Sequence, residues 1–203
     1  MSKLVYGVGI NDVDYKVSKK VELPKVNGKR KQKLVWVCPY YVKWKEMLRR
    51  CYDETWLEIN PSYFGCKVCD QWLYLSNFIK WVDSQPNKDW KNCQLDKDIL
   101  VVGNKVYSEE TAAFVSKDIN VFITDHSAAR GSYLLGVSFH ARIGKFQSQI
   151  SDPFLRKNIS LGYYDTELEA HLAWKKKKKE FALMLSESCQ DSRIRDALIK
   201  RYS

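Results

Sequence analysis

The last third of the chain contains the pattern that most restricts what it can fold into. We predict three short β-strands there, over residues 135–143, 145–151 and 158–164. Gly144 occupies the first turn, and Pro153 follows the second strand. A long helix is predicted over residues 165–185, because Thr166 and Glu169 can form a capping box at its start. Three antiparallel strands with one helix across a face make an α+β unit, so we expect an α+β protein.

The middle of the chain combines helices with short strands. An amphipathic helix is predicted to begin near Pro39, and a shorter one near Ser76. The apolar stripe of the first consists of Trp44, Met47, Leu48 and Cys51. Residues 93–122 are interpreted as a strand, a Gly-Asn loop, a second strand at 113–115 and a helix that begins at Ser116.

Changes in composition divide the chain into four expected parts, over residues 1–34, 35–130, 131–186 and 187–203. The first is interpreted as a basic N-terminal arm, interrupted by Pro24 and Gly28. The second and third are folded modules, and the polar residues 124–132 are predicted to link them. The fourth part is interpreted as a polar, basic tail with at most a final turn or two of helix.

The charge of the chain is uneven. Of 203 residues, 45% are apolar, which suffices for a core, and the net charge is +10. Residues 1–50 carry 13 basic and 4 acidic side chains, residues 51–130 carry 8 and 12, and residues 131–203 carry 13 and 8. Two basic ends indicate a polyanionic partner, with double-stranded DNA favoured over a membrane surface. Ordinary solubility is the alternative, and the acidic middle could bind a basic protein.

The location expected from the sequence is the cytoplasm. No run approaches 18 consecutive apolar residues, and residues 1–7 lack the apolar stretch of a secretory signal. The six cysteines are therefore expected to be reduced. Cys66 and Cys69 have the spacing of two zinc ligands, but the chain offers no second such pair. Buried thiols are the favoured interpretation, and a structural zinc ion is the alternative.

One group of polar residues falls on the strand, loop and helix predicted within residues 93–122. They are Asp96, Lys97, Asn104 and Asn120. A carboxylate on a strand and an amide on a helix can hold a divalent cation, which neutralises charge on a scissile phosphate. With Cys66-Lys67-Val68-Cys69 upstream, these residues resemble the HNH endonuclease family, in particular phage-encoded homing endonucleases. The resemblance implies a ββα-metal module that cleaves or nicks DNA inside an infected bacterium. It also implies Asp96 and Asn120 as ligands of Mg²⁺ or another divalent cation.

Lys97 occupies the position where that family has its general-base histidine. A lysine with an ordinary pKa is protonated at neutral pH and cannot accept a proton from water. Asp96 and Asp98 beside it favour the charged form. Two hypotheses remain open: a metal-dependent nuclease with Lys97 and Asn104 near the phosphate, or an inactive DNA-binding repressor or inhibitor of the same fold.

A second resemblance lies in the last third. Its residues are Gly136-Val137, Gly144-Lys145-Phe146, Leu161-Gly162-Tyr163-Tyr164 and Glu169-Ala170. In this order they resemble the plant ethylene-response-factor (AP2-type) DNA-binding domain and its phage relatives. The resemblance implies a three-stranded sheet that enters the major groove with one face while a helix packs behind the other.

The candidate DNA-binding residues follow from strand alternation and charge. Lys145, Gln147 and Gln149 are predicted to share the exposed face. The full set is His140, Arg142, Lys145, Gln147, Gln149, Arg156 and Lys157, with Lys29, Arg30 and Lys31 in the basic arm. Glutamine can bond adenine edges, and arginine or lysine can bond guanine or phosphate. The five lysines at 175–179 point around a helix, so most are expected either to be solvated or to extend along the side of Trp174 and Phe181.

Overall fold

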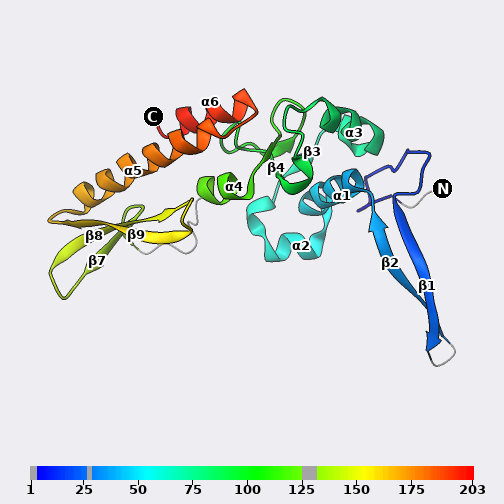
Figure 1. The fold of residues 1–203 in the computed structure, drawn as a ribbon, viewed down its shortest axis with the longest axis horizontal. Helices are drawn as coiled ribbons and strands as arrows, with labels where there is room; N and C mark the ends of the chain where they lie inside the picture. The colour runs from blue at the N-terminus through cyan, green and yellow to red at the C-terminus, as the bar shows by residue number, and fades with distance from the viewer. Residues whose placement is uncertain (1–3, 27–28, 125–131) are drawn as a thin grey trace. The chain divides into compact units, whose positions relative to one another are not determined.

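The computed structural model describes residues 4–26, 29–124 and 132–203, and has a mixed α+β fold (Figure 1). The chain forms two compact units, which divide between Phe114 and Val115. The predicted linker at 124–132 falls largely outside the described residues. The division lies before it because α4 (Lys117–Ile123) packs with the second unit.

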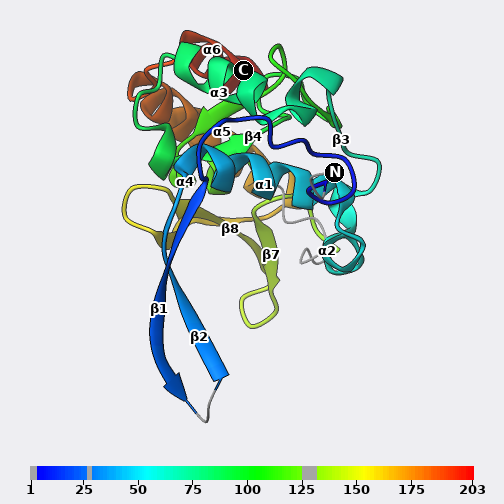
Figure 2. The ribbon, with the colours of Figure 1, turned by 90° about the vertical axis from the view of Figure 1, so that its right-hand side faces the viewer.

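The first unit begins with a correction to the predicted arm. Residues 18–26 and 29–37 form an antiparallel pair of strands, β1 (Ser18–Val26) and β2 (Lys29–Val37), which we call the β1–β2 hairpin and which extends away from α1 (Figures 1 and 2). The residues before it are also folded, because Val5, Val8 and Val13 pack against the core of the unit. The described part of residues 1–34 therefore belongs to the first unit rather than to a separate arm.

The core of the first unit is built on helices and indole rings. α1 (Pro39–Tyr52) buries the predicted apolar stripe, and α3 (Leu75–Ser84) lies where the short helix was expected. The indole nitrogen of Trp44 donates to the carbonyl oxygen of Trp72 at 2.7 Å, and the ring of Trp72 lies 4.4 Å from that of Trp81. Apolar spacing predicted the buried stripe of α1 and most of that of α3, whereas the contacts of Trp72 with Trp44 and Trp81 join separate segments and were not predicted.

Short elements complete the first unit. They are α2 (Glu54–Ile59), β3 (Lys67–Val68), β4 (Gln94–Asp96), β5 (Val106–Tyr107) and β6 (Ala113–Val115). β3 pairs with β5 in parallel, and β4 pairs with β6. The predicted strands at the start of residues 93–122 and at 113–115 and the helix after Ser116 are present, but β5 lies between the two strands where only a loop was expected. The Ser116 hydroxyl caps α4 by accepting from the amide of Ile119.

The second unit contains the predicted three-stranded antiparallel sheet. Its strands are β7 (Val137–His140), β8 (Lys145–Asp152) and β9 (Lys157–Tyr164), in that order. α5 (Glu167–Glu187) packs against β8 and β9, and it begins with the predicted capping box of Thr166 and Glu169. This part of the fold agrees with the sequence because alternation and capping are local signals.

The prediction that residues 187–203 form a polar tail with little structure is wrong. Residues 192–201 form α6 (Ser192–Arg201), which packs on α5 and buries Ile194 and Leu198. The Asp191 carboxylate caps its first turn and forms an ion pair with Arg193 at 2.6 Å. These two apolar residues, four positions apart, are enough to attach the helix. None of the helices in the described parts of the chain is long and apolar enough to span a lipid bilayer.

Candidate DNA-binding face and polar loop

The polar face of the sheet is positioned by strand alternation in β8. Lys145, Gln149 and Ser151 are exposed and Gln147 is half-buried, whereas Ser148 and Ile150 are buried toward α5. The predicted separation of Lys145, Gln147 and Gln149 from the helix-covered face is therefore confirmed. Cross-strand partners extend the polar face across the sheet.

Those partners come from both neighbouring strands. Ser138 of β7 and Tyr163 of β9 are in register with Gln147, and Ser160 is in register with Gln149. The side-chain amide of Gln147 donates to the Ser160 hydroxyl at 3.3 Å. The face therefore presents amide, hydroxyl and phenol groups, all of which can form hydrogen bonds with base edges.

The cationic candidates lie at one end of this face. Arg142 is exposed in the turn between β7 and β8. His140 is in register with Lys145, and its ring contacts that of Tyr163 edge-to-face at 5.6 Å. The Nδ1 atom of His140 is buried without a hydrogen-bond partner. Lys145 forms an exposed ion pair with Asp165 at 3.0 Å, so its charge is partly balanced within the unit.

Arg156 and Lys157 do not join the glutamine face. Lys157 is in register with Asp152, which is buried on the helix side of the sheet. Arg156 has a positive φ of 53° in the turn before β9, and its guanidinium donates to the Asp118 carboxylate of α4 at 3.1 Å. The two residues were predicted to bind DNA from the second hairpin, and the structure places them away from the face of Lys145, Gln147 and Gln149. Their contact with DNA stays a prediction.

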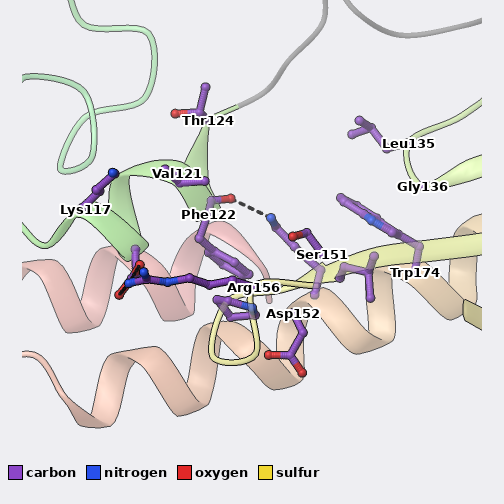
Figure 3. Close-up of a pocket in the computed structure, with 14 residues that line it drawn as sticks. Lys117, Val121, Phe122, Thr124, Leu135, Gly136, Ser151, Asp152, Arg156 and Trp174 are labelled. Carbon is purple, nitrogen blue, oxygen red and sulfur yellow. Dashed lines mark hydrogen bonds and ion pairs between the residues drawn. The ribbon is translucent and has the colours of Figure 1, made fainter. Parts of the chain in front are cut away.

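A pocket on the helix side of the second unit was not predicted. It has a volume of about 620 Å³ and is lined by residues of α4, β8 and α5, including Phe122 and Trp174, and by Arg156 of the turn before β9 (Figure 3). Lys178 also lines it, and its ammonium group donates to the Phe122 carbonyl oxygen at 2.6 Å. The contact of Lys178 with Trp174 agrees with the expectation that some of these lysines lie along that side of the helix, whereas its bond to Phe122 was not predicted. Its partner is 56 residues away in the sequence, so local spacing gave no signal.

The hairpin of the first unit contains the remaining cationic candidates. Lys31 is exposed on β2, in register with Leu23. Lys29 and Arg30 belong to the same strand, but their side chains lie outside the described part of the structure.

The second predicted group begins with Asp96, at the end of β4. One oxygen of its carboxylate accepts the backbone N–H groups of Asp98 and Ile99, at 2.9 and 2.7 Å. Burial and the nearby Asp98 carboxylate raise the pKa of Asp96, although the two backbone donors act in the opposite direction. Asp96 therefore holds the turn after β4, in addition to any contact with a ligand.

Lys97 is buried beside this turn, and its ammonium group forms an ion pair with Asp98 at 3.0 Å. Burial lowers the pKa of Lys97, but the hydrogen bond and charge of Asp98 and the charge of Asp96 outweigh it and raise the pKa. A lysine held in its charged form cannot accept a proton from water. Its chemistry is that of a fixed positive charge.

Asn104 closes the loop between the two strands. Its amide nitrogen donates to the carbonyl oxygens of Lys97 and Val106, at 2.7 and 2.6 Å. Its amide oxygen accepts from the backbone N–H of Val106 at 3.2 Å. The side chain thus bonds to backbone groups on both sides of the loop and holds the loop closed.

The predicted metal ligands are not brought together within one unit. Asp96 belongs to the first unit, and Asn120 is half-buried in α4 of the second. Cys66 is buried and Cys69 half-buried, and burial raises the pKa of both thiols. Across residues 4–26, 29–124 and 132–203, no three His, Cys, Asp or Glu side chains gather as possible metal ligands. Within the first unit, the residues around Asp96 do not form a complete ligand set.

Comparisons with known proteins complete the description of these sites. No protein-family model matches the chain, and neither the curated proteins nor the solved structures include one that is similar to it.

Proposed function

We propose that this protein binds double-stranded DNA through the polar face of its three-stranded sheet. The observation that supports this most directly is the alternation in β8, with Lys145, Gln147 and Gln149 on the face opposite α5. A sheet covered by a helix on one side leaves the other side available, and strands are known to read base edges in a groove. Arg142, exposed at the end of this face, is suited to a guanine or a phosphate.

Sequence preference distinguishes groove binding from attraction to phosphates. Gln147→Ala and Arg142→Ala should reduce discrimination between duplexes enriched by selection from a random pool and the unselected pool. Their affinity for random DNA should fall less than their affinity for the selected sites. Gln190→Ala is the matched control, because Gln190 is exposed between α5 and α6, away from the sheet. Equal losses on selected and random DNA would contradict the proposal.

Metal-dependent cleavage is the second candidate function. The order of β4, loop, β6 and α4 favours it, together with the position of Asp96 at the end of β4. The charged state of Lys97 argues against a base at that position and favours DNA binding without cleavage. Because no three His, Cys, Asp or Glu side chains gather as possible ligands in the described parts of the chain, we derive no catalytic step through a metal.

A nicking assay separates the two candidates. The protein is incubated with supercoiled plasmid in Mg²⁺ or Mn²⁺, beside Asp96→Asn, which retains a side-chain oxygen for the turn. Nicks that the wild-type protein makes and Asp96→Asn does not would establish the nuclease. DNA binding without nicks by either protein supports the inactive DNA-binding protein.

A further inference from the structure

The two faces of the β1–β2 hairpin differ in charge. The register pairs Lys19 with Trp36, Val21 with Lys33, and Leu23 with Lys31, and directly paired residues point to the same face. We call these six residues the lysine face of the hairpin. All six side chains are exposed, and its three lysines are accompanied by no acidic residue.

The opposite face has a different composition. Glu22 is in register with Gln32, and Lys20 with Leu34. At the end of the hairpin nearest to α1, this face lines a pocket together with α1 residues, and Lys20 and Leu34 contribute to the lining. One lysine and one glutamate nearly balance each other there. Among the hairpin side chains that the structure describes, the excess of positive charge therefore lies on one side of the ribbon.

The apolar residues of the lysine face are also unusual for an exposed hairpin. Val21, Leu23 and Trp36 are 45%, 41% and 40% exposed. The ammonium group of Lys19 lies 5.6 Å from the centre of the Trp36 ring. A two-stranded ribbon with exposed apolar side chains is marginal by itself, and such a surface usually has a partner.

We infer that the lysine face is a second DNA-binding surface, which enters the major groove as a two-stranded ribbon. The width of the major groove admits such a ribbon, the three lysines complement the flanking phosphates, and the apolar side chains can contact thymine methyl groups. The hairpin extends away from α1, so the groove could surround it (Figure 2). This inference rests on the proposed function and adds an element in the first unit to it.

Lysine footprinting tests which face meets DNA. The whole protein is acetylated with a limiting reagent, with and without duplex DNA of random sequence at low salt, and modified lysines are quantified by mass spectrometry. Lys19, Lys31 and Lys33 should be protected several-fold by DNA. Lys20, on the opposite face of the same ribbon, is the internal control and should be protected less.

Binding measurements over a range of salt concentrations provide the second arm. Lys33→Gln should reduce the slope of log affinity against log salt by about 1, and Lys20→Gln by less than half of that. Equal slopes for Lys33→Gln and the wild-type protein, with DNA binding otherwise intact, would overturn the inference and leave the proposed function standing. Failure of the wild-type protein to bind DNA would contradict both this inference and the proposed function.

A membrane surface is the other class of partner that lysines beside apolar side chains can fit. The footprint is therefore repeated with vesicles of phosphatidylglycerol and phosphatidylcholine. Protection of Lys19, Lys31 and Lys33 by vesicles but not by DNA would overturn the inference. Protection by DNA alone supports it.

Discussion

The ammonium group of Lys178 lies 3.6 Å from the centre of the Phe122 ring and also donates to the Phe122 carbonyl oxygen. The rings of Trp174 and Tyr202 lie within 5.7 and 5.4 Å of the same atom. One cation thus connects α4, α5 and the residue after α6. Its neighbours in the lysine run do not share these contacts.

Replacement of Lys178 should therefore destabilise the second unit. Lys178→Met keeps most of the side-chain length but removes the charge and the hydrogen bond, and we expect a loss of about 2 kcal/mol in the free energy of unfolding. Lys176→Met is the matched control, because Lys176 is exposed on the same helix. Urea denaturation followed by circular dichroism measures both. Equal stability of the two variants would show that the aromatic contacts contribute little.

Gly136 should not tolerate a side chain. Its φ is 76°, and a Cβ atom added there would lie 1.9 Å from Cδ1 of Trp174. Gly136→Ala therefore combines backbone strain with a clash, and should cost about 3 kcal/mol or more. Gly144→Ala separates the two effects, because φ is 66° there and the added Cβ would have no neighbour within 4 Å. Thermal denaturation should show the smaller loss, about 1 kcal/mol, for Gly144→Ala.

Leu198 tests whether α6 is integral to the second unit. Its side chain is fully buried, and Leu198→Ala should reduce the free energy of unfolding by about 3 kcal/mol. Ile199→Ala, at a position 37% exposed on the same helix, should cost less than about 1 kcal/mol. Chemical denaturation of both variants checks the difference. If both variants lose a similarly small free energy of unfolding, α6 does not contribute to the core of the second unit, and residues 187–203 behave as the predicted tail.

The pKa of Asp96 predicts a pH dependence of stability. A carboxyl group whose pKa is higher in the folded than in the unfolded protein binds more protons when folded. Its contribution is therefore most favourable below the usual pKa of 3.8, and is lost as the pH rises through the elevated value. Asp96→Asn retains an oxygen for the amides of Asp98 and Ile99, and should remove this dependence.

Asp96→Ala provides the contrast, because it also removes both backbone hydrogen bonds. We expect it to lose about 2 kcal/mol relative to Asp96→Asn at every pH. Unfolding curves between about pH 4 and about pH 8, a range that spans carboxyl and histidine titration, measure both effects. A wild-type protein whose stability rises through the acidic part of that range, by an amount that Asp96→Asn abolishes, would contradict the elevated pKa.

Local signals accounted for most of the second unit and the first helix. The capping box of Thr166 and Glu169 marked the start of α5, and alternation from Lys145 to Ile150 identified the two faces of β8. Each signal lies within a few residues, so no knowledge of tertiary contacts was needed.

The hairpin and α6 were missed for identifiable reasons. Lysine-rich segments with Pro24 have low β-propensity, and the pairing that forms the hairpin joins residues as far apart as Ser18 and Val37. α6 has only two buried apolar residues in a polar sequence, which is too weak a periodic signal. The contacts of Arg156 and Lys178 with α4 join distant segments, so they could not be inferred from spacing.

The register shift between Ser148 and Gln149 has a consequence for anyone who redesigns this sheet. It changes the parity of β9, so that Asn158 and Ser160 face the same side as Tyr163 although simple alternation would separate them. If base-contacting side chains were introduced into β9 at every second position, those on one side of the register shift would face α5 instead of the polar face of the sheet. Substitutions in β9 must be numbered from their partners in β8.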